Sequence, residues 1–143
     1  MATDRTAEVT WRGDLTSGGG RIDSVGSGAF GGLDVDWRAR TEDAQFNTSP
    51  EELIAAAHAS CLSMALSSAL AKAGHAPQEL KTSATVTFQP GEGITKIALR
   101  VAGNVPGMSD DEFRRTAATA KENCPVSKAL AGVEISLDAE LRG

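Results

Sequence analysis

Two cysteines are the residues of this 143-residue chain best equipped for chemistry. Cys61 lies inside a long alanine-rich segment, and Cys124 comes directly before Pro125 in the run ENCPVSKAL. They are 63 residues apart, so they match neither a CxxC redox motif nor the ligand spacing of a zinc site. If the fold brings them together, they make one reversible disulfide and the chain is a thiol redox protein. The alternative is a pair of inert buried thiols.

A cysteine attacks only as the thiolate, and an ordinary thiol with a pKa of about 8.5 is mostly protonated at neutral pH. Cys124 stands at the expected start of a helix, where the free amides of Val126 and Ser127 favour a negative sulfur. Cys61 has no such help inside its own helix. Its pKa is therefore raised unless a cation reaches it from elsewhere.

Arg38 and Arg40, on the segment before the helix, are the candidate cations for Cys61. They lie on one face of an expected strand, so the alternating pattern does not choose between them. Glu51 can hold an arginine by accepting its guanidinium fork. Ten helical residues separate Glu51 from Cys61, which corresponds to ~15 Å. A shared site therefore needs a long arginine as a bridge, or a Glu51 from a second copy of the chain.

Two more side chains fall on the expected helical face of Cys61, which we interpret as an apolar groove for substrate. His58 lies one turn before the cysteine, where it is either half of a Cys–His pair or a wall residue. Met64 belongs to the same strip. A metal site is not expected, because neither the cysteines nor the two histidines have ligand spacing.

The elements before the long helix are predicted to be strands. Residues 8–11 and 21–25 alternate apolar and polar side chains, and residues 33–40 do so again with Trp37 opposite the two arginines. Residues 41–48 are polar and typical of a loop.

The long helix carries three agreeing start signals. Ser49 suits the N-cap, Pro50 suits the first helical position, and Glu52 completes a capping box. The helix is expected to run to about Ala73 and to stop at Gly74.

The remaining chain alternates strands and helices. The turn Pro90-Gly91-Glu92-Gly93 predicts a hairpin, and Ser109 with Glu112 predicts a capped helix. The expected elements are strands at 81–89 and 94–102, helices at 110–123 and 125–130, and a last strand at 133–141. This order predicts a single α+β domain over residues 1–143.

Composition excludes several function classes. The net charge is −5 and the basic residues form no block, so neither nucleic acid nor an anionic membrane is an expected partner. The amino terminus has no signal-peptide pattern. The longest apolar stretch contains His58 and several serines, and we expect it to be too short and too polar to span a bilayer. A cytoplasmic protein is expected, in which a paired thiol would form a transient disulfide.

The runs TSPEELIAAAHASCLSMAL, CPVSKAL and VEISLDAEL resemble the OsmC/Ohr family of osmotically inducible and organic hydroperoxide resistance proteins. The segments AEVTWRGDLTSGGGRI and ITKIALRVAGNVPGMSDDEF are similar to its OsmC branch, so the resemblance covers nearly the whole chain. It implies antiparallel sheets wrapped around a long central helix. It also implies an intertwined homodimer with two active sites at the subunit interface.

The resemblance implies a thiol peroxidase for organic hydroperoxides, and for hydrogen peroxide, and assigns its residues. Cys61 corresponds to the peroxidatic thiol, Cys124 to the resolving thiol, and Glu51 to the glutamate of the family's PEE motif. The family's arginine falls on Arg40, with Arg38 as the alternative. Cys61 would become a sulfenic acid, and Cys124 would convert it to a disulfide.

No prosthetic group is expected, and an external dithiol reductant, of the lipoyl type, would reopen the disulfide. Two other classes stay open. A lipid or small-molecule binding stress protein would use the groove around Cys61, and a structural stress protein would have unreactive thiols.

Overall fold

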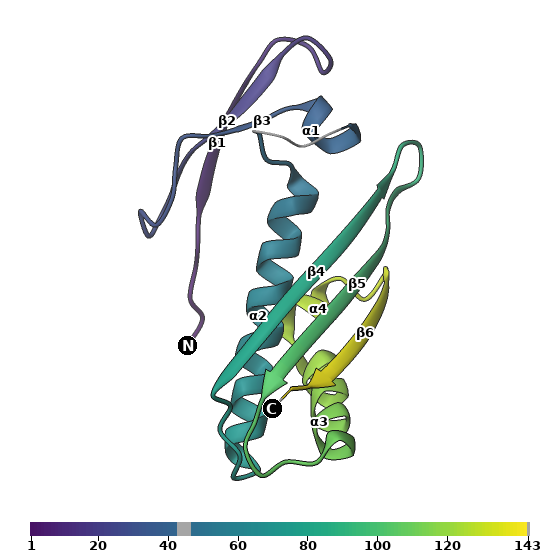
Figure 1. Ribbon diagram of the computed structural model, residues 1–143. Coiled ribbons are helices and arrows are strands. Elements are labelled where there is room, and N and C mark those ends of the chain that lie inside the picture. Colours follow the sequence, from purple (N-terminus) through teal and green to yellow (C-terminus); the bar gives the residue numbers. More distant parts are fainter. Residues whose placement is uncertain (43–46, 143) are drawn as a thin grey trace. The chain divides into compact units, whose positions relative to one another are not determined.

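The long helix is α2, Pro50–Lys72, in the computed structural model, which describes residues 1–42 and 47–142 (Figure 1). The Glu52 amide donates to the Ser49 hydroxyl over 3.2 Å, which confirms the N-cap. The Glu52 carboxylate accepts a hydrogen bond from the Thr48 hydroxyl at 2.9 Å. At the other end Gly74 has φ +87°, and the His75 amide donates back to a carbonyl of the last turn. This closure confirms the predicted stop.

The chain divides into two compact units, Met1–Leu53 and Ile54–Gly143. The first unit contains a three-stranded antiparallel sheet in the order β1-β2-β3. Its strands are β1 (Ala7–Arg12), β2 (Gly19–Val25) and β3 (Leu33–Val35). The first two confirm the predicted strands.

The third predicted strand is wrong beyond Val35. Helix α1, Trp37–Thr41, begins there, because Asp36 acts as its N-cap and accepts a hydrogen bond from the Ala39 amide at 2.7 Å. Five residues are too few for a helical period to stand out against the apparent alternation. Of the predicted loop at 41–48, residues 43–46 lie outside the described residues.

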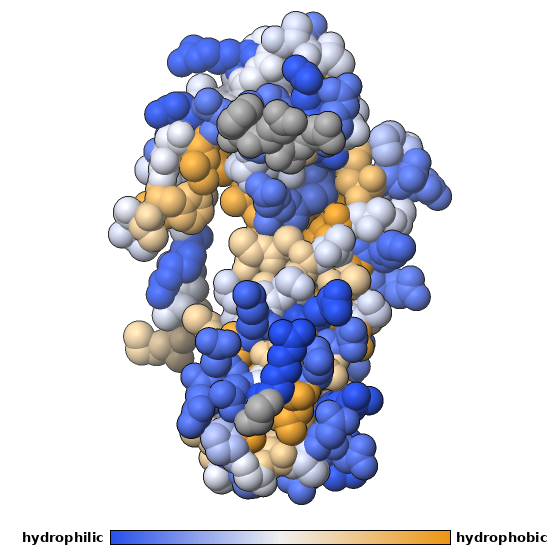
Figure 2. All heavy atoms as spheres, in the orientation of Figure 1, coloured by the Kyte–Doolittle hydropathy of each residue, from blue (hydrophilic) through white to orange (hydrophobic). Residues whose placement is uncertain are grey.

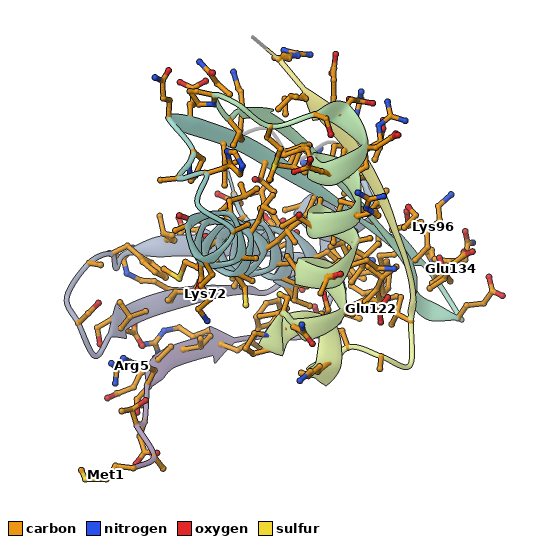
Figure 3. The ribbon with its side chains drawn as sticks, turned by 90° about the horizontal axis from the view of Figure 1, so that it is seen from below. Met1, Arg5, Lys72, Lys96, Glu122 and Glu134 are labelled. Atoms are coloured by element: carbon orange, nitrogen blue, oxygen red, sulfur yellow. The ribbon has the colours of Figure 1, made fainter. Side chains whose placement is uncertain are left out.

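The second unit is built on a mixed sheet in the order β4-β5-β6. Strands β4 (Glu79–Gln89) and β5 (Gly93–Asn104) form the predicted antiparallel hairpin. Strand β6 (Glu134–Leu141) pairs with β5 in parallel, where the family resemblance implied antiparallel sheets. Lys96 of β5 and Glu134 of β6 are partners in this register and lie side by side in Figure 3.

A parallel pair needs a crossover connection, and two helices supply it. They are α3 (Asp110–Asn123) and α4 (Pro125–Ala129). The Glu112 amide donates to the Ser109 hydroxyl at 3.2 Å, which confirms the predicted cap of α3. Figure 3, which looks along α2, shows α3 beside it on one side of the sheet.

The core of the second unit lies between these helices and that face of the sheet. Leucines spaced four residues apart on α2 meet alternate residues of β5 and the inner face of α3. The fully or almost fully buried members are Leu62, Leu66, Leu70, Ile97, Leu99, Val101, Phe113 and Ala117. These contacts fix α2, and with it Cys61, against the crossover that carries Cys124.

The expectation that the apolar stretch is too short and polar to span a bilayer is wrong. Helix α2 has 23 residues and is long and apolar enough to cross a membrane by length and composition alone. A core helix passes the same test, and α2 packs its leucine face into the core of the second unit. The fold class, α+β with two small sheets and a central helix, is confirmed.

Candidate active site

The structure brings Cys61 and Cys124 together within the second unit. Cys61 is half-buried on α2, and Cys124 is fully buried at the start of α4. Both are free thiols, and their side chains interact directly enough for each to shift the pKa of the other. Interacting thiols that lie 63 residues apart in the sequence are the arrangement from which a reversible disulfide can form.

Cys124 is the more acidic thiol in this arrangement. Burial acts to raise its pKa, but the amide of Ser127, the Cys61 thiol, the hydroxyl of Ser127 and the amide of Val126 together bring the pKa below its usual value. The sulfur makes no regular capping hydrogen bond to α4 within the described chain. The nearby donors nevertheless favour the thiolate, as the sequence predicted for this position.

The pKa of the Cys61 thiol lies above its usual value. Burial is the largest cause, and the neighbouring Cys124 adds to it, while the amide of Val126 acts in the opposite direction. The helix around Cys61 thus leaves its thiol protonated at neutral pH. A cation near the sulfur is needed to reverse that shift.

His58 is not on an open groove wall. Its side chain is 0% exposed, and its Nε2 lies 2.8 Å from the hydroxyl of Ser127, which is also buried. Burial lowers the pKa of His58, so the imidazole is neutral at pH 7. Sequence analysis assigned Ser127 only a backbone amide. Its position three residues after Cys124, at N3 of α4, could have predicted that its hydroxyl lies near the Cys124 side chain, because N-cap and N3 side chains lie close together.

Arg40 and Glu51 form a two-pronged ion pair in the first unit. Arg40 Nε lies 3.1 and 3.0 Å from the two carboxylate oxygens of Glu51, and a terminal guanidinium nitrogen lies 2.9 Å from Oε2. Glu51 is 6% exposed, and the Arg40 guanidinium lies 5.9 Å from the ring centroid of Trp37. The arginine is therefore held on both sides.

Arg38 takes a different partner. Its Nε lies 3.0 Å from Glu42 within an exposed ion pair. On a helix, residues two positions apart point in nearly opposite directions, so α1 separates the two arginines that a strand would have aligned. The contact with Glu51 belongs to Arg40.

Met64 is exposed, with 74% of its surface accessible, while His58 is buried. The structure therefore does not place these two predicted substrate-binding residues on one groove. Contact of Met64 with substrate stays a prediction. In the described part of the chain, no group of three or more His, Cys, Asp and Glu side chains could hold a metal ion.

Two interacting free thiols of unequal acidity, on elements fixed by a common core, are the arrangement expected of a thiol-dependent redox protein. Known proteins support this class. A family model described as OsmC-like protein matches residues 40–138. The chain is 39% identical over 145 residues to Peroxiredoxin OsmC of Escherichia coli strain K12, and the match covers 99% of both chains.

Solved structures agree with the sequence comparison. The organic hydroperoxide resistance protein OhrB of Bacillus subtilis matches with a TM-score of 0.63 and 25% identity, over 96% of this chain and 98% of that one. An OsmC-like protein of Mycoplasma pneumoniae has the same fold, with a TM-score of 0.71, 17% identity, and coverage of 99% and 100%. The chain belongs to the OsmC-like family. It is an enzyme with peroxidase activity.

Proposed function

We propose that this peroxidase reduces organic hydroperoxides, and also hydrogen peroxide, to alcohols or water through Cys61 and Cys124. The observation that carries the proposal is the direct interaction of the two free thiols within one unit. The relative from Bacillus subtilis, named for organic hydroperoxide resistance, supports the substrate class.

Cys61 performs the first step as a thiolate. Its sulfur attacks the distal oxygen of the hydroperoxide, the O–O bond breaks, and the departing alkoxide takes a proton to become the alcohol. Cys61 is left as a sulfenic acid, two electrons more oxidised. Its half-buried position on α2 leaves the sulfur reachable, whereas Cys124 is fully buried. This difference in access supports Cys61 as the thiol that meets the peroxide.

Cys124 performs the second step. Its thiolate attacks the sulfur of the Cys61 sulfenic acid, an S–S bond forms, the S–O bond breaks, and the departing hydroxide becomes water with one proton. An external dithiol, of the lipoyl type, then returns both cysteines to thiols and is itself oxidised to a disulfide. The low pKa of Cys124 supports its role as the resolving nucleophile.

Arg40 supplies the cation that Cys61 needs. A guanidinium beside the sulfur opposes the rise in pKa caused by burial, and the same fork can bind a peroxide oxygen. Glu51 acts through Arg40 by fixing its orientation, which is supported by the ion pair between them. No prosthetic group takes part in these steps.

The working unit is a homodimer. Large apolar side chains remain at the surface of the first unit, whose small sheet buries few of them. Of the most apolar 18-residue stretch of α2, only 22% is buried within a single chain. Figure 2 shows hydrophobic side chains reaching the surface. Patches of this kind mark contact sites. The exposed large apolar residues are Met1, Val9, Trp11, Leu15, Phe30 and Leu33 in the first unit and Met64 on α2.

A second copy would cover these surfaces and could bring its own Arg40 and Glu51 to Cys61. A second copy would also cover the apolar surface of α2 with protein, so this helix needs no membrane around it. We therefore propose that the enzyme is cytoplasmic.

The test uses peroxide consumption with dihydrolipoamide, compared with glutathione, and with organic hydroperoxides compared with hydrogen peroxide. The wild type should turn over with the dithiol, and Cys61→Ser should be inactive. Cys124→Ser should consume one equivalent of peroxide and stop as a sulfenic acid. Mass spectrometry of the oxidised wild type should show an intramolecular Cys61–Cys124 disulfide. Substantial turnover by Cys61→Ser, or oxidation that yields only intermolecular disulfides, would refute the mechanism.

A further inference from the structure

Two pairs of side chains, all buried except the half-buried Cys61, face each other across helices α2 and α4. His58 and Cys61 are three residues apart on α2, and Cys124 and Ser127 are three residues apart at the start of α4. Nε2 of His58 lies 2.8 Å from the hydroxyl oxygen of Ser127, and the side chains of Cys61 and Cys124 interact. The spacing matches on both sides because residues three apart share one face of a helix.

The hydrogen-bond direction within the first pair follows from burial. A neutral imidazole has one N–H donor and one bare nitrogen. Nδ1 of His58 is buried and has no partner among the described residues, and a buried N–H without an acceptor is rarer than a buried lone pair without a donor. We therefore assign the hydrogen to Nε2, which donates to the oxygen of Ser127. The Ser127 hydroxyl then keeps its own hydrogen for another acceptor.

The sulfur of Cys124 is the candidate acceptor. Ser127 lies on the same face of the first turn, and its hydroxyl is among the groups that favour the Cys124 thiolate. A hydroxyl whose oxygen already accepts a hydrogen bond is polarised and becomes a better donor.

We propose that His58 and Ser127 are positioning residues for the resolving step, forming a chain of donors from His58 Nε2–H to Ser127 Oγ–H to the Cys124 sulfur. This inference deepens the proposed function and rests on it. The chain holds Cys124 as a thiolate directed at the sulfur of Cys61. When the S–S bond forms and hydroxide leaves Cys61, the sulfur of Cys124 loses its negative charge and Ser127 loses its strongest acceptor.

The surroundings of Cys124 define what else can titrate with it. From α2 it faces Cys61, with His58 one turn earlier. On α3 and α4 the nearest basic residues in sequence are Lys121 and Lys128. A direct measurement on Cys124 therefore uses a chain in which Cys61 is replaced.

The experiment titrates the Cys124 thiolate by its ultraviolet absorbance in the Cys61→Ser protein, which requires neither peroxide turnover nor access of a reagent. Adding Ser127→Ala should raise the midpoint by about one to two pH units, because a hydrogen bond to a charged group is lost. His58→Leu should raise it by a smaller amount in the same direction. Ser127→Thr and His58→Gln keep a donor at each place and should return the midpoint toward that of the parent.

Ser60→Ala is the matched control, because its hydroxyl is exposed and bonded to the Ala56 carbonyl. It should leave the midpoint unchanged. An unchanged midpoint in Ser127→Ala, or a raised one in Ser127→Thr, would overturn the proposal. If His58→Leu fails to fold by circular dichroism, the two Ser127 variants decide the question.

In chains that retain both cysteines, Ser127→Ala should lengthen the lifetime of the Cys61 sulfenic acid without slowing the initial consumption of peroxide. An equal slowing of both steps would assign Ser127 a general structural role. Absence of sulfenic acid in the wild type would instead contradict the proposed function, while the titration would still test the donor chain.

Discussion

Arg38 and Arg40 carry the same charge two residues apart, yet they occupy different environments. Arg40 is bound by both oxygens of a buried carboxylate, whereas Arg38 pairs with Glu42 in solvent. An exposed ion pair contributes about 0–1 kcal/mol, and its loss is easily absorbed. Removing Arg40 leaves the carboxylate of Glu51 buried without its partner, which is far more costly.

At the residue scale, Arg40→Ala should raise the pKa of Cys61 by about one to three units, because a neighbouring positive charge is lost. At neutral pH the thiolate fraction, and with it the rate of peroxide attack, should fall by about tenfold or more. Arg40→Lys should not restore the rate, because an ammonium group lacks the fork that Glu51 binds. The measurements are the initial rate of peroxide consumption and the pH midpoint of Cys61 alkylation in the Cys124→Ser protein.

Arg38→Ala is the control for the same charge change and should stay within about twofold of the parent rate. A larger defect in Arg38→Ala than in Arg40→Ala would mean that Arg38, and not Arg40, is the active-site cation.

At the scale of elements, the sequence predicts most of the fold because its boundaries carry local signals. Ser49 and Ser109 cap the helices as expected, and Gly74 stops α2. The failure at residues 36–40 has a local cause as well. A five-residue helix gives no readable period, and the capping role of Asp36 appears only when its side chain is seen to accept the Ala39 amide.

The site could be predicted only in part. Cys61 and Cys124 stand out by type, but the contact between His58 and Ser127 joins residues 69 positions apart and leaves no periodic trace. The parallel pairing of β5 and β6 could not be predicted from the local sequence either, because the alternation of side chains within a strand does not determine the direction of the neighbouring strand.

The packing of α3 on the second sheet yields a prediction. A methyl group added at Gly103 of β5 would lie 2.6 Å from Cζ of Phe113 and 3.2 Å from Cδ2 of Leu80. Phe113 is fully buried and has no room to retreat. Gly103→Ala should therefore lower the free energy of unfolding by about 1–3 kcal/mol.

Urea denaturation at one fixed protein concentration measures this loss. Gly132→Ala is the control, because an added methyl group there meets no atom within 4 Å. It should change the free energy of unfolding by less than about 0.5 kcal/mol. Equal stability of the two variants would mean that α3 packs differently on β5.

At the scale of the whole molecule, the proposed dimer with shared sites predicts complementation. Glu51→Ala and Cys61→Ser chains should each be inactive alone. Mixed under conditions that exchange subunits, they should recover up to half of the wild-type activity per heterodimer. Each heterodimer has one site with an intact Cys61 and an intact Glu51 from the other chain. Peroxide consumption measures the recovery, and sedimentation measures the assembly.

The matched control mixes Cys61→Ser with Cys124→Ser. Both thiols lie in the second unit of one chain, so no heterodimer contains a complete pair and no turnover should return. A protein that sediments as a monomer, or exchanged mixtures that remain inactive, would rule out shared sites.

The parallel pairing of β5 and β6 also orders events during synthesis. Strand β6 follows both cysteines in the chain, and it reaches its place beside β5 through the crossover that contains Cys124, α3 and α4. Contacts of such high sequence separation form slowly. A nascent chain consequently carries Cys61 as a lone thiol until the crossover closes. A chain whose crossover is still open therefore lacks a resolving partner beside Cys61, and a sulfenic acid formed there would be exposed to further, irreversible oxidation.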